Sequence, residues 1–154
     1  MAAKLANVNG IRIWHDQALI KEPWGNPTGW HLDNPKWSYN SKNTLTIWIA
    51  LDDATLSNGC MYFIPGSHKM TFDKSFFNEK GFFKTSCNRE LVSRKIDISL
   101  NQGDLLVFHC RTLHSAGWNR GSSAKLSLVF TYYHPSNLPV VGTRSASIDP
   151  IQIG

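Results

Sequence analysis

Two histidines and one aspartate have the residue types and spacing of a metal site. His31 and Asp33 are two residues apart in Gly-Trp-His-Leu-Asp-Asn, and His114 lies far downstream in Thr-Leu-His-Ser-Ala-Gly. On neighbouring strands, two imidazoles and one carboxylate can occupy one face of an octahedral metal and leave the other face open, as in non-haem iron(II) oxygenases. The spacing alone is a weak signal, because a His and an Asp two residues apart also occur by chance. The motif predicts an oxygen-activating enzyme if the three side chains converge.

The length and composition predict one globular domain spanning residues 1–154, with 136–154 as a polar C-terminal tail. A chain of 154 residues that is 42% hydrophobic can build a single core. Its apolar runs are too short to span a bilayer, and the N-terminal Met-Ala-Ala-Lys-Leu-Ala lacks the long apolar stretch of a secretory signal. We expect a soluble, cytoplasmic protein that does not bind membranes.

Charge and cysteine content exclude several other classes. The net charge of +5 comes from lysines and arginines scattered along the chain, and the densest stretch, 69–95, also contains acidic residues. Without a basic stripe, nucleic-acid binding is not expected, whereas an acidic small-molecule substrate is compatible with this charge. Cys60, Cys87 and Cys110 are odd in number and widely spaced, so neither a disulfide framework nor a zinc finger is indicated.

Short β-prone runs separated by turn residues dominate the chain. Residues 43–51 alternate, with Leu45, Ile47 and Ile49 on one face and Thr44, Thr46 and Trp48 on the other. Further strands are predicted at 11–14, 17–21, 60–64, 94–100, 105–109 and 125–133, with His31 on a short strand or at its end. Residues 69–93 have no clean period and predict an excursion loop with a short helix. About eight strands and little helix favour an all-β sandwich or barrel.

The sequence resembles the phytanoyl-CoA dioxygenase family over roughly residues 10 to 135. The resemblance rests on Trp-His-Leu-Asp at 30–33, Thr-Ile-Trp-Ile-Ala-Leu-Asp-Asp-Ala-Thr at 46–55 and Asn-Gly-Cys-Met-Tyr-Phe-Ile-Pro-Gly-Ser-His-Lys at 58–69. Gly-Asp-Leu-Leu-Val-Phe-His at 103–109 and Leu-His-Ser-Ala-Gly-Trp-Asn-Arg at 113–120 continue it in the same order. It implies a double-stranded β-helix, or jelly-roll, that holds iron(II) and 2-oxoglutarate between two sheets. His31, Asp33 and His114 match the metal ligands of the family.

The resemblance also predicts how the co-substrate is held. Relatives usually place an arginine for the distal carboxylate of 2-oxoglutarate eleven positions after the second metal histidine, and Lys125 stands there (125 − 114 = 11). Lys125 and Ser127 alternate so that both would face the same carboxylate, and Arg120 is the substitute if Lys125 faces solvent. Trp48 and Gln17 match positions that line the co-substrate pocket in relatives.

Other side chains near these motifs have weaker assignments. Lys21 shares a strand face with Gln17 and is a candidate for meeting an anionic group. A set of aromatic residues flanks the expected metal mouth and is a candidate substrate wall, or else packs under the loops: Trp30, Trp37, Tyr39 and Trp118. The remaining histidines, including His68 and His109, are expected to be structural.

The function expected from these residues is oxidation of a small organic substrate by O2, with conversion of 2-oxoglutarate to succinate and CO2. Two alternatives are a non-catalytic jelly-roll binding module and a cupin-type metal enzyme that does not use 2-oxoglutarate. Relatives are commonly longer and have N-terminal helices that cover one sheet. The expectation is therefore that this chain is a fragment or that homo-oligomerisation covers the sheet.

Overall fold

The structure, a computed structural model, describes residues 1–33, 44–143 and 151–153. Their elements in chain order are α1 (Ala2–Ala6), β1 (Ile11–Lys21), β2 (Thr28–His31), β3 (Thr44–Ala50), β4 (Met61–Phe63), the 3-10 turns η2 (Ser67–Lys69), η3 (Lys74–Phe76) and η4 (Thr85–Cys87), α2 (Arg89–Ser93), β5 (Ile96–Ile98), β6 (Leu105–His109), β7 (His114–Ala116), β8 (Lys125–Tyr133) and β9 (Ile151–Ile153). The predicted all-β class with little helix is confirmed.

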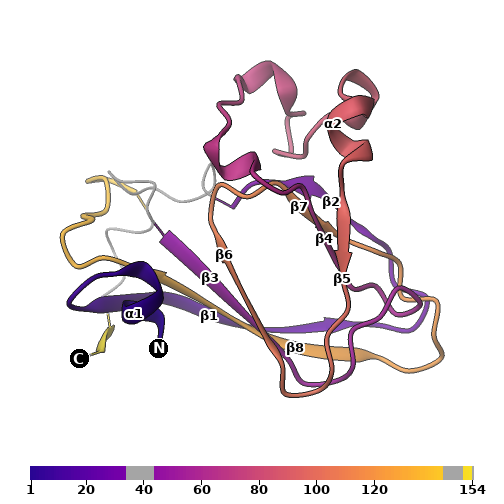
Figure 1. The fold of residues 1–154 in the computed structure, drawn as a ribbon, viewed down its shortest axis with the longest axis horizontal. Helices are drawn as coiled ribbons and strands as arrows, with labels where there is room; N and C mark the ends of the chain where they lie inside the picture. The colour runs from indigo at the N-terminus through magenta and orange to yellow at the C-terminus, as the bar shows by residue number, and fades with distance from the viewer. Residues whose placement is uncertain (34–43, 144–150, 154) are drawn as a thin grey trace.

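The strands form two facing sheets (Figure 1). One sheet has the order β6-β3-β8-β1-β9, the other has the order β2-β7-β4-β5, and neighbouring strands pair antiparallel in both. The excursion between β4 and β5, which contains η2 to η4 and α2, lies over one end of the second sheet (Figure 1). Two facing antiparallel sheets of this kind are the jelly-roll that the family resemblance implied.

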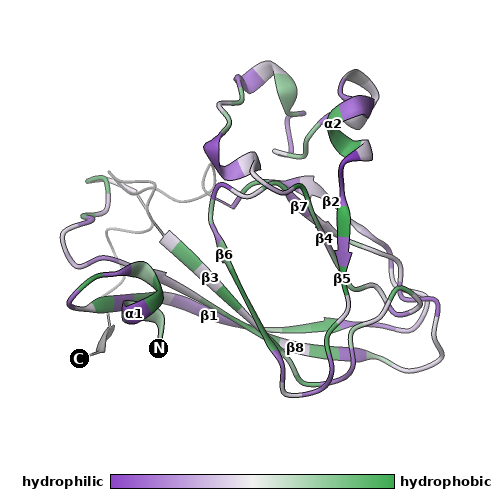
Figure 2. Cartoon of the chain, viewed as in Figure 1, coloured by the Kyte–Doolittle hydropathy of each residue, from purple (hydrophilic) through white to green (hydrophobic). Residues whose placement is uncertain are grey.

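Strand alternation separates the interior from the outer face of the larger sheet. Along β8, the buried residues are Lys125, Ser127, Val129, Thr131 and Tyr133, and the residues between them are more exposed. In Figure 2 hydrophobic segments alternate with paler ones along β3 and β8. The β8 pattern is unusual because polar side chains outnumber apolar ones on a buried face. Such a face indicates an interior that binds something polar.

Apolar side chains from both sheets form the core between them. Trp48 and Val129 are cross-strand neighbours in the larger sheet, and they pack with Met61 and Phe63 of the second sheet. A second cluster lies under the excursion, where Phe83 packs with the buried residues Leu32, Ile64 and Leu113. The first cluster therefore supports the sandwich, and the second supports its excursion.

Three local features differ from the predictions made from the sequence. The two short runs expected at 11–14 and 17–21 form one strand, β1, with a register shift between Ile13 and His15 that keeps the pairing with β8 continuous. Residues 114–116 form β7, which no pattern predicted because three residues are too few for alternation to be visible. The tail 136–154 is not irregular throughout, since residues 151–153 form β9 and pair with the start of β1.

None of the helices in the described residues is long and apolar enough to cross a lipid bilayer.

The turn at Asn58-Gly59 holds the chain close to the end of β7. Asn58 accepts a hydrogen bond from the backbone N–H of Thr55 at 2.7 Å and donates one to the carbonyl of Asp53 at 2.7 Å. Gly59 has a φ of +84°, and a Cβ atom there would lie 2.6 Å from the carbonyl oxygen of Gly117. Only glycine fits this backbone conformation and this approach without strain.

We expect Gly59→Ala to destabilise the fold by at least about 1 kcal/mol more than Gly66→Ala, because it adds a steric clash to the cost of a positive φ. Gly66 is the matched control, since its φ is +77° and no atom lies within 4 Å of the position that a Cβ atom would take there. Chemical denaturation of both variants measures the difference. Equal losses of unfolding free energy would show that the Gly117 contact is unimportant.

Candidate metal centre and pocket

The pairing of β2 with β7 places two histidines opposite each other. His31 is the last residue of β2 and His114 the first residue of β7, and they are partners in the antiparallel register. Asp33 follows two residues after His31, and its backbone N–H donates to the carbonyl of Cys110 at 3.1 Å. Backbone pairing thus brings together two histidines that are 83 positions apart in the sequence (114 − 31 = 83).

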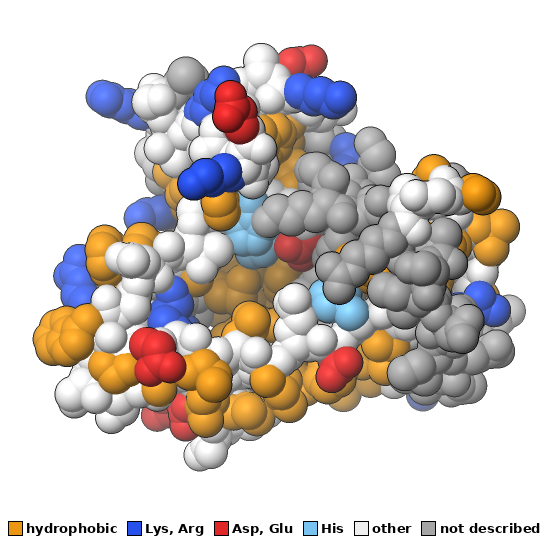
Figure 3. Space-filling model, turned by 180° about the vertical axis from the view of Figure 1, so that it is seen from behind, with side chains coloured by type: hydrophobic (Ala, Val, Ile, Leu, Met, Phe, Trp, Pro, Cys, Tyr) orange, Lys and Arg blue, Asp and Glu red, His pale blue; other side chains and the backbone are white. Residues whose placement is uncertain are grey.

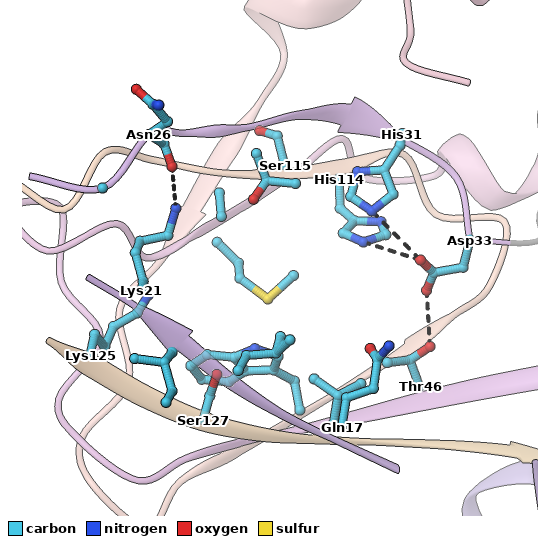
Figure 4. A pocket seen from close by; sticks show the side chains of 18 of the residues that line it. Gln17, Lys21, Asn26, His31, Asp33, Thr46, His114, Ser115, Lys125 and Ser127 are labelled. Atoms are coloured by element: carbon cyan, nitrogen blue, oxygen red, sulfur yellow. Dashed lines mark hydrogen bonds and ion pairs between the residues drawn. The ribbon is translucent and has the colours of Figure 1, made fainter. Parts of the chain in front are cut away.

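The three side chains converge on one point. The Nε2 atoms of His31 and His114 each lie 3.7 Å from Oδ1 of Asp33. One ligand atom from each residue lies within 4.8 Å of the other two. The distances from Nε2 to Oδ1 are longer than those of hydrogen bonds and leave room for an ion between the three groups. Figure 4 shows the two rings and the carboxylate facing one another at one end of a pocket.

Backbone carbonyls set the orientation of both imidazoles. Nδ1 of His31 lies 2.8 Å from the carbonyl oxygen of Gly29, and Nδ1 of His114 lies 2.8 Å from that of Thr112. A carbonyl oxygen can only accept, so each Nδ1 carries the proton and donates it. In the neutral imidazole the lone pair is then on Nε2, the atom that faces Asp33. This is the tautomer that a metal-binding histidine needs.

The hydrogen bond to Asp33 and the types of the three ligand atoms both suit a divalent metal. Oγ1 of Thr46, on β3, donates to Oδ2 of Asp33 at 3.1 Å, and Oδ1 is the oxygen nearer both histidines. Two neutral imidazole nitrogens and one carboxylate oxygen suit iron(II) and its neighbours, and the group contains no thiolate. The residues present therefore fit iron(II).

A cavity of about 480 Å³ extends from this cluster between the two sheets. In the space-filling view a hollow with a hydrophobic floor exposes histidine and acidic side chains (Figure 3). Besides the three residues of this cluster, the lining residues that could contact a ligand through polar side chains include Gln17, Lys21, Glu22, Asn26, Thr28, Thr46, Ser115, Lys125 and Ser127. A cavity of this size is in the range of small-molecule binding sites.

Lys125 and Ser127 lie at the end of the cavity away from the metal ligands (Figure 4). Lys125 is 4% exposed, its Nζ donates to the carbonyl of Gly59, and it lies 5.5 Å from the centre of the Trp48 ring. Burial, reinforced by the charge of Lys21, lowers the pKa of Lys125 to about 8, and the neighbouring Cys60 partly opposes this shift. A buried cation of this kind is suited to holding an anionic group.

The other residues singled out in the sequence fall in different places. Gln17 and Trp48 line the cavity, and Trp48 also belongs to the core. Arg120 is exposed, is not among the cavity residues, and its backbone N–H donates to the carbonyl of Ser57 at 2.8 Å. Of these two candidate cations, Lys125 therefore faces the cavity and Arg120 does not.

The two flanking tryptophans that the structure describes are not among the residues that line this cavity. Trp30 packs against the cluster under the excursion, and Trp118 is 47% exposed and is not among the cavity residues. Trp37 and Tyr39 lie outside the described residues. An aromatic residue that the sequence reasoning missed, Phe82 of the excursion, makes an edge-to-face contact with His31 at 6.1 Å between ring centres.

Thr46 was also missed as a site residue, although its inward face was predicted. The alternation of 43–51 places Thr46 on the same face as Trp48, and this was the available signal. A polar residue on an otherwise buried strand face, in register with Thr131 of β8, could have been assigned to the site on that ground.

Comparisons with known proteins agree with this geometry. The family model for phytanoyl-CoA dioxygenase (PhyH) matches residues 2–127. A probable alpha-ketoglutarate-dependent hypophosphite dioxygenase from Stutzerimonas stutzeri is 28% identical over 138 residues, which cover 86% of this chain and 48% of that protein. The phytanoyl-CoA dioxygenase of Arabidopsis thaliana is 29% identical over 130 residues, covering 80% and 46% respectively. The chain thus spans about half the length of the curated relatives it matches.

A solved structure with a bound metal has the same fold. The crystal structure of the epimerase SnoN in complex with Fe3+, alpha ketoglutarate and nogalamycin RO superimposes with a TM-score of 0.79 at 27% identity. The match covers 90% of this chain and 55% of SnoN. The jelly-roll of this chain is therefore similar to one that holds iron and 2-oxoglutarate.

We expect Thr46→Val to weaken binding of a divalent metal by about 10- to 100-fold, because Asp33 loses a donor that orients its carboxylate. Thr46→Ser keeps the hydroxyl and should stay close to wild type. Titration with Mn(II) under calorimetry measures both affinities. Equal affinities for the valine and serine variants would contradict an orienting role for this hydroxyl.

Proposed function

The chain belongs to the phytanoyl-CoA dioxygenase family, and from this premise we propose that it is the catalytic jelly-roll of an iron(II)- and 2-oxoglutarate-dependent oxygenase. The proposed substrate is a small organic molecule, which is oxidised by O2 while 2-oxoglutarate is converted to succinate and CO2. The observation that carries the proposal is the convergence of His31, Asp33 and His114 at the mouth of a cavity that ends in a buried cation.

The metal-binding residues have one task, which is to fix the position of the ion. His31 and His114 would each supply Nε2 and Asp33 would supply Oδ1, and the remaining coordination positions would stay open for the co-substrate and O2. When bound, iron(II) with 2-oxoglutarate supplies the oxidising chemistry. The Gly29 and Thr112 carbonyls and the Thr46 hydroxyl hold the ligands in place before the metal arrives.

The far end of the cavity would select the co-substrate. The 2-oxo acid group of 2-oxoglutarate would bind at the metal, and its distal carboxylate would extend to Lys125 and Ser127 (Figure 4). A buried ammonium group without an acidic neighbour is destabilising, and an incoming carboxylate relieves this. Trp48 and Val129 form apolar walls along the way, which exclude water from the reacting groups.

We expect the wild-type protein to form succinate from 2-oxoglutarate in the presence of iron(II), and His31→Ala to abolish it, because two remaining ligands do not hold the ion in the required geometry. Succinate is measured by chromatography, both with a panel of candidate substrates and without any added substrate. His134→Ala is the matched control, because this histidine is not among the metal-site or cavity residues near Asp33.

The result separates the three functions considered from the sequence. Succinate formation that needs His31 supports the oxygenase. Binding of 2-oxoglutarate without succinate formation would indicate a binding module, and metal-dependent oxygen uptake that ignores 2-oxoglutarate would indicate a cupin-type enzyme. Succinate formation that survives His31→Ala would contradict the metal site.

We expect Lys125→Met to weaken 2-oxoglutarate binding by roughly 3 kcal/mol, on the order of a hundredfold, because the carboxylate would be buried without a cation. Calorimetry with the Mn(II)-loaded protein measures the affinity directly. Arg120→Met is the control, since this side chain is exposed outside the cavity. If Arg120→Met lost 2-oxoglutarate affinity and Lys125→Met did not, Arg120 would be the residue that holds the distal carboxylate.

The lowered pKa of Lys125 gives the same contact a pH dependence. Its free ammonium loses its proton as the pH rises through about 8, so 2-oxoglutarate affinity should fall between about pH 7 and pH 9.5. Lys125→Arg keeps a charged group over this range and should show a much smaller fall. Calorimetry across this pH range measures the 2-oxoglutarate affinity of the wild-type protein and of Lys125→Arg. An equal fall in affinity for the two proteins would show that titration of Lys125 is not the cause.

A further inference from the structure

A second lysine shares the far end of the cavity with Lys125. Lys21 ends β1 and is the cross-strand partner of Lys125, the first residue of β8. Both side chains are on the inward face of the larger sheet, and both line the cavity (Figure 4). Like charges directly opposite each other in a sheet are destabilising. This pairing therefore needs a reason beyond the stability of the sheet.

Neither ammonium group has an acidic partner in the part of the chain that the structure describes. Lys21 Nζ donates to the carbonyls of Asn26 at 2.8 Å and Gly117 at 2.9 Å, and Lys125 donates to that of Gly59. The ion pairs found among the described residues involve neither lysine. Burial lowers the pKa of both lysines, and the charge of Lys21 lowers that of Lys125 further. Glu22 also lines the cavity, but it is exposed and is in none of the ion pairs found among the described residues. Two partly desolvated cations that are not ion-paired are arranged to receive an anion.

The backbone around the two lysines holds their positions. A Cβ atom on Gly59 would lie 3.0 Å from Cδ of Lys21 and 2.6 Å from the Gly117 carbonyl oxygen. The absence of a side chain at Gly59 therefore lets its own carbonyl, which accepts the hydrogen bond from Lys125, lie beside the side chain of Lys21. Through its two hydrogen bonds, Lys21 also connects the loop after β1 to the end of β7. The two cations are thus fixed by main-chain groups from different elements.

Building on the function proposed above, we propose that Lys21 and Lys125 together form a two-lysine clamp for the distal carboxylate of 2-oxoglutarate. A carboxylate has two oxygens, and one planar guanidinium can bond both at once, whereas one ammonium acts as a point charge. Two ammonium groups on adjacent strands can contact one oxygen each. Lys21 is in this account a co-substrate-binding residue.

The position of the clamp favours the co-substrate over the oxidised substrate as its ligand. The two lysines lie at the opposite end of the cavity from His31, Asp33 and His114 (Figure 4). A molecule that is oxidised must present its reacting carbon beside the metal ligands, whereas 2-oxoglutarate carries anionic groups at both of its ends. One end would bind the metal and the other would bind the lysines.

The test compares two 2-oxo acids that differ at the distal end. 2-Oxoglutarate and pyruvate share the group that would bind the metal, but pyruvate has no distal carboxylate. In calorimetry with the Mn(II)-loaded protein at about pH 7, Lys21→Met should weaken 2-oxoglutarate binding about tenfold and leave pyruvate binding unchanged. Lys21→Arg should retain most of the wild-type affinity for 2-oxoglutarate. Lys84→Met, which removes one exposed lysine outside this cavity, is the control for net charge.

Each other outcome has a defined meaning. Unchanged 2-oxoglutarate binding in Lys21→Met would overturn the clamp and leave Lys125 as the anchor. Equal losses for 2-oxoglutarate and pyruvate would also overturn it, because Lys21 would then act by holding the Asn26 and Gly117 carbonyls in place. If the wild-type protein bound pyruvate and 2-oxoglutarate equally, the clamp would be overturned, because the distal carboxylate would contribute no affinity. If it bound neither acid, the proposed function would be overturned, and the clamp with it.

Discussion

The site depends on the antiparallel register that makes His31 the partner of His114. Because these residues are directly opposite on β2 and β7, their rings lie 4.2 Å apart between centres, and both Nε2 atoms reach the same oxygen of Asp33. A shift of one residue would turn a histidine to the other face of its strand. The convergence of the three candidate metal ligands is thus a consequence of strand pairing, and the carbonyls of Gly29 and Thr112 then select the tautomer of each histidine.

The interior of this sandwich is divided along its length. Apolar residues such as Trp48 and Phe63 fill the core, whereas β8 places Lys125, Ser127 and Thr131 on the same buried face. Buried polar groups lower stability unless they are bonded or occupied. Between the two sheets lies a cavity with the candidate metal ligands at one end and a buried cation at the other (Figure 4).

A lysine at the cationic end of the cavity behaves differently from an arginine in the same place. A guanidinium stays charged at any pH the protein meets, whereas a buried ammonium can lose its proton. The charge of this end therefore depends on burial, on the neighbouring Lys21 and on whether an anion is present. An anion bound beside Lys125 would favour its protonated form, so the proposed binding of the co-substrate and the protonation of Lys125 would be coupled.

The sequence by itself determined the fold class, the strands at 44–50, 105–109 and 125–133, and the identity of the metal-binding candidates, because alternation and short motifs depend on local order. It did not determine the pairing of β2 with β7, the strand β9, or the exclusion of Arg120 from the cavity. Those depend on contacts between residues far apart in the chain. Local sequence fixes which way a side chain faces along its strand, but only the packing of two sheets decides what that face meets.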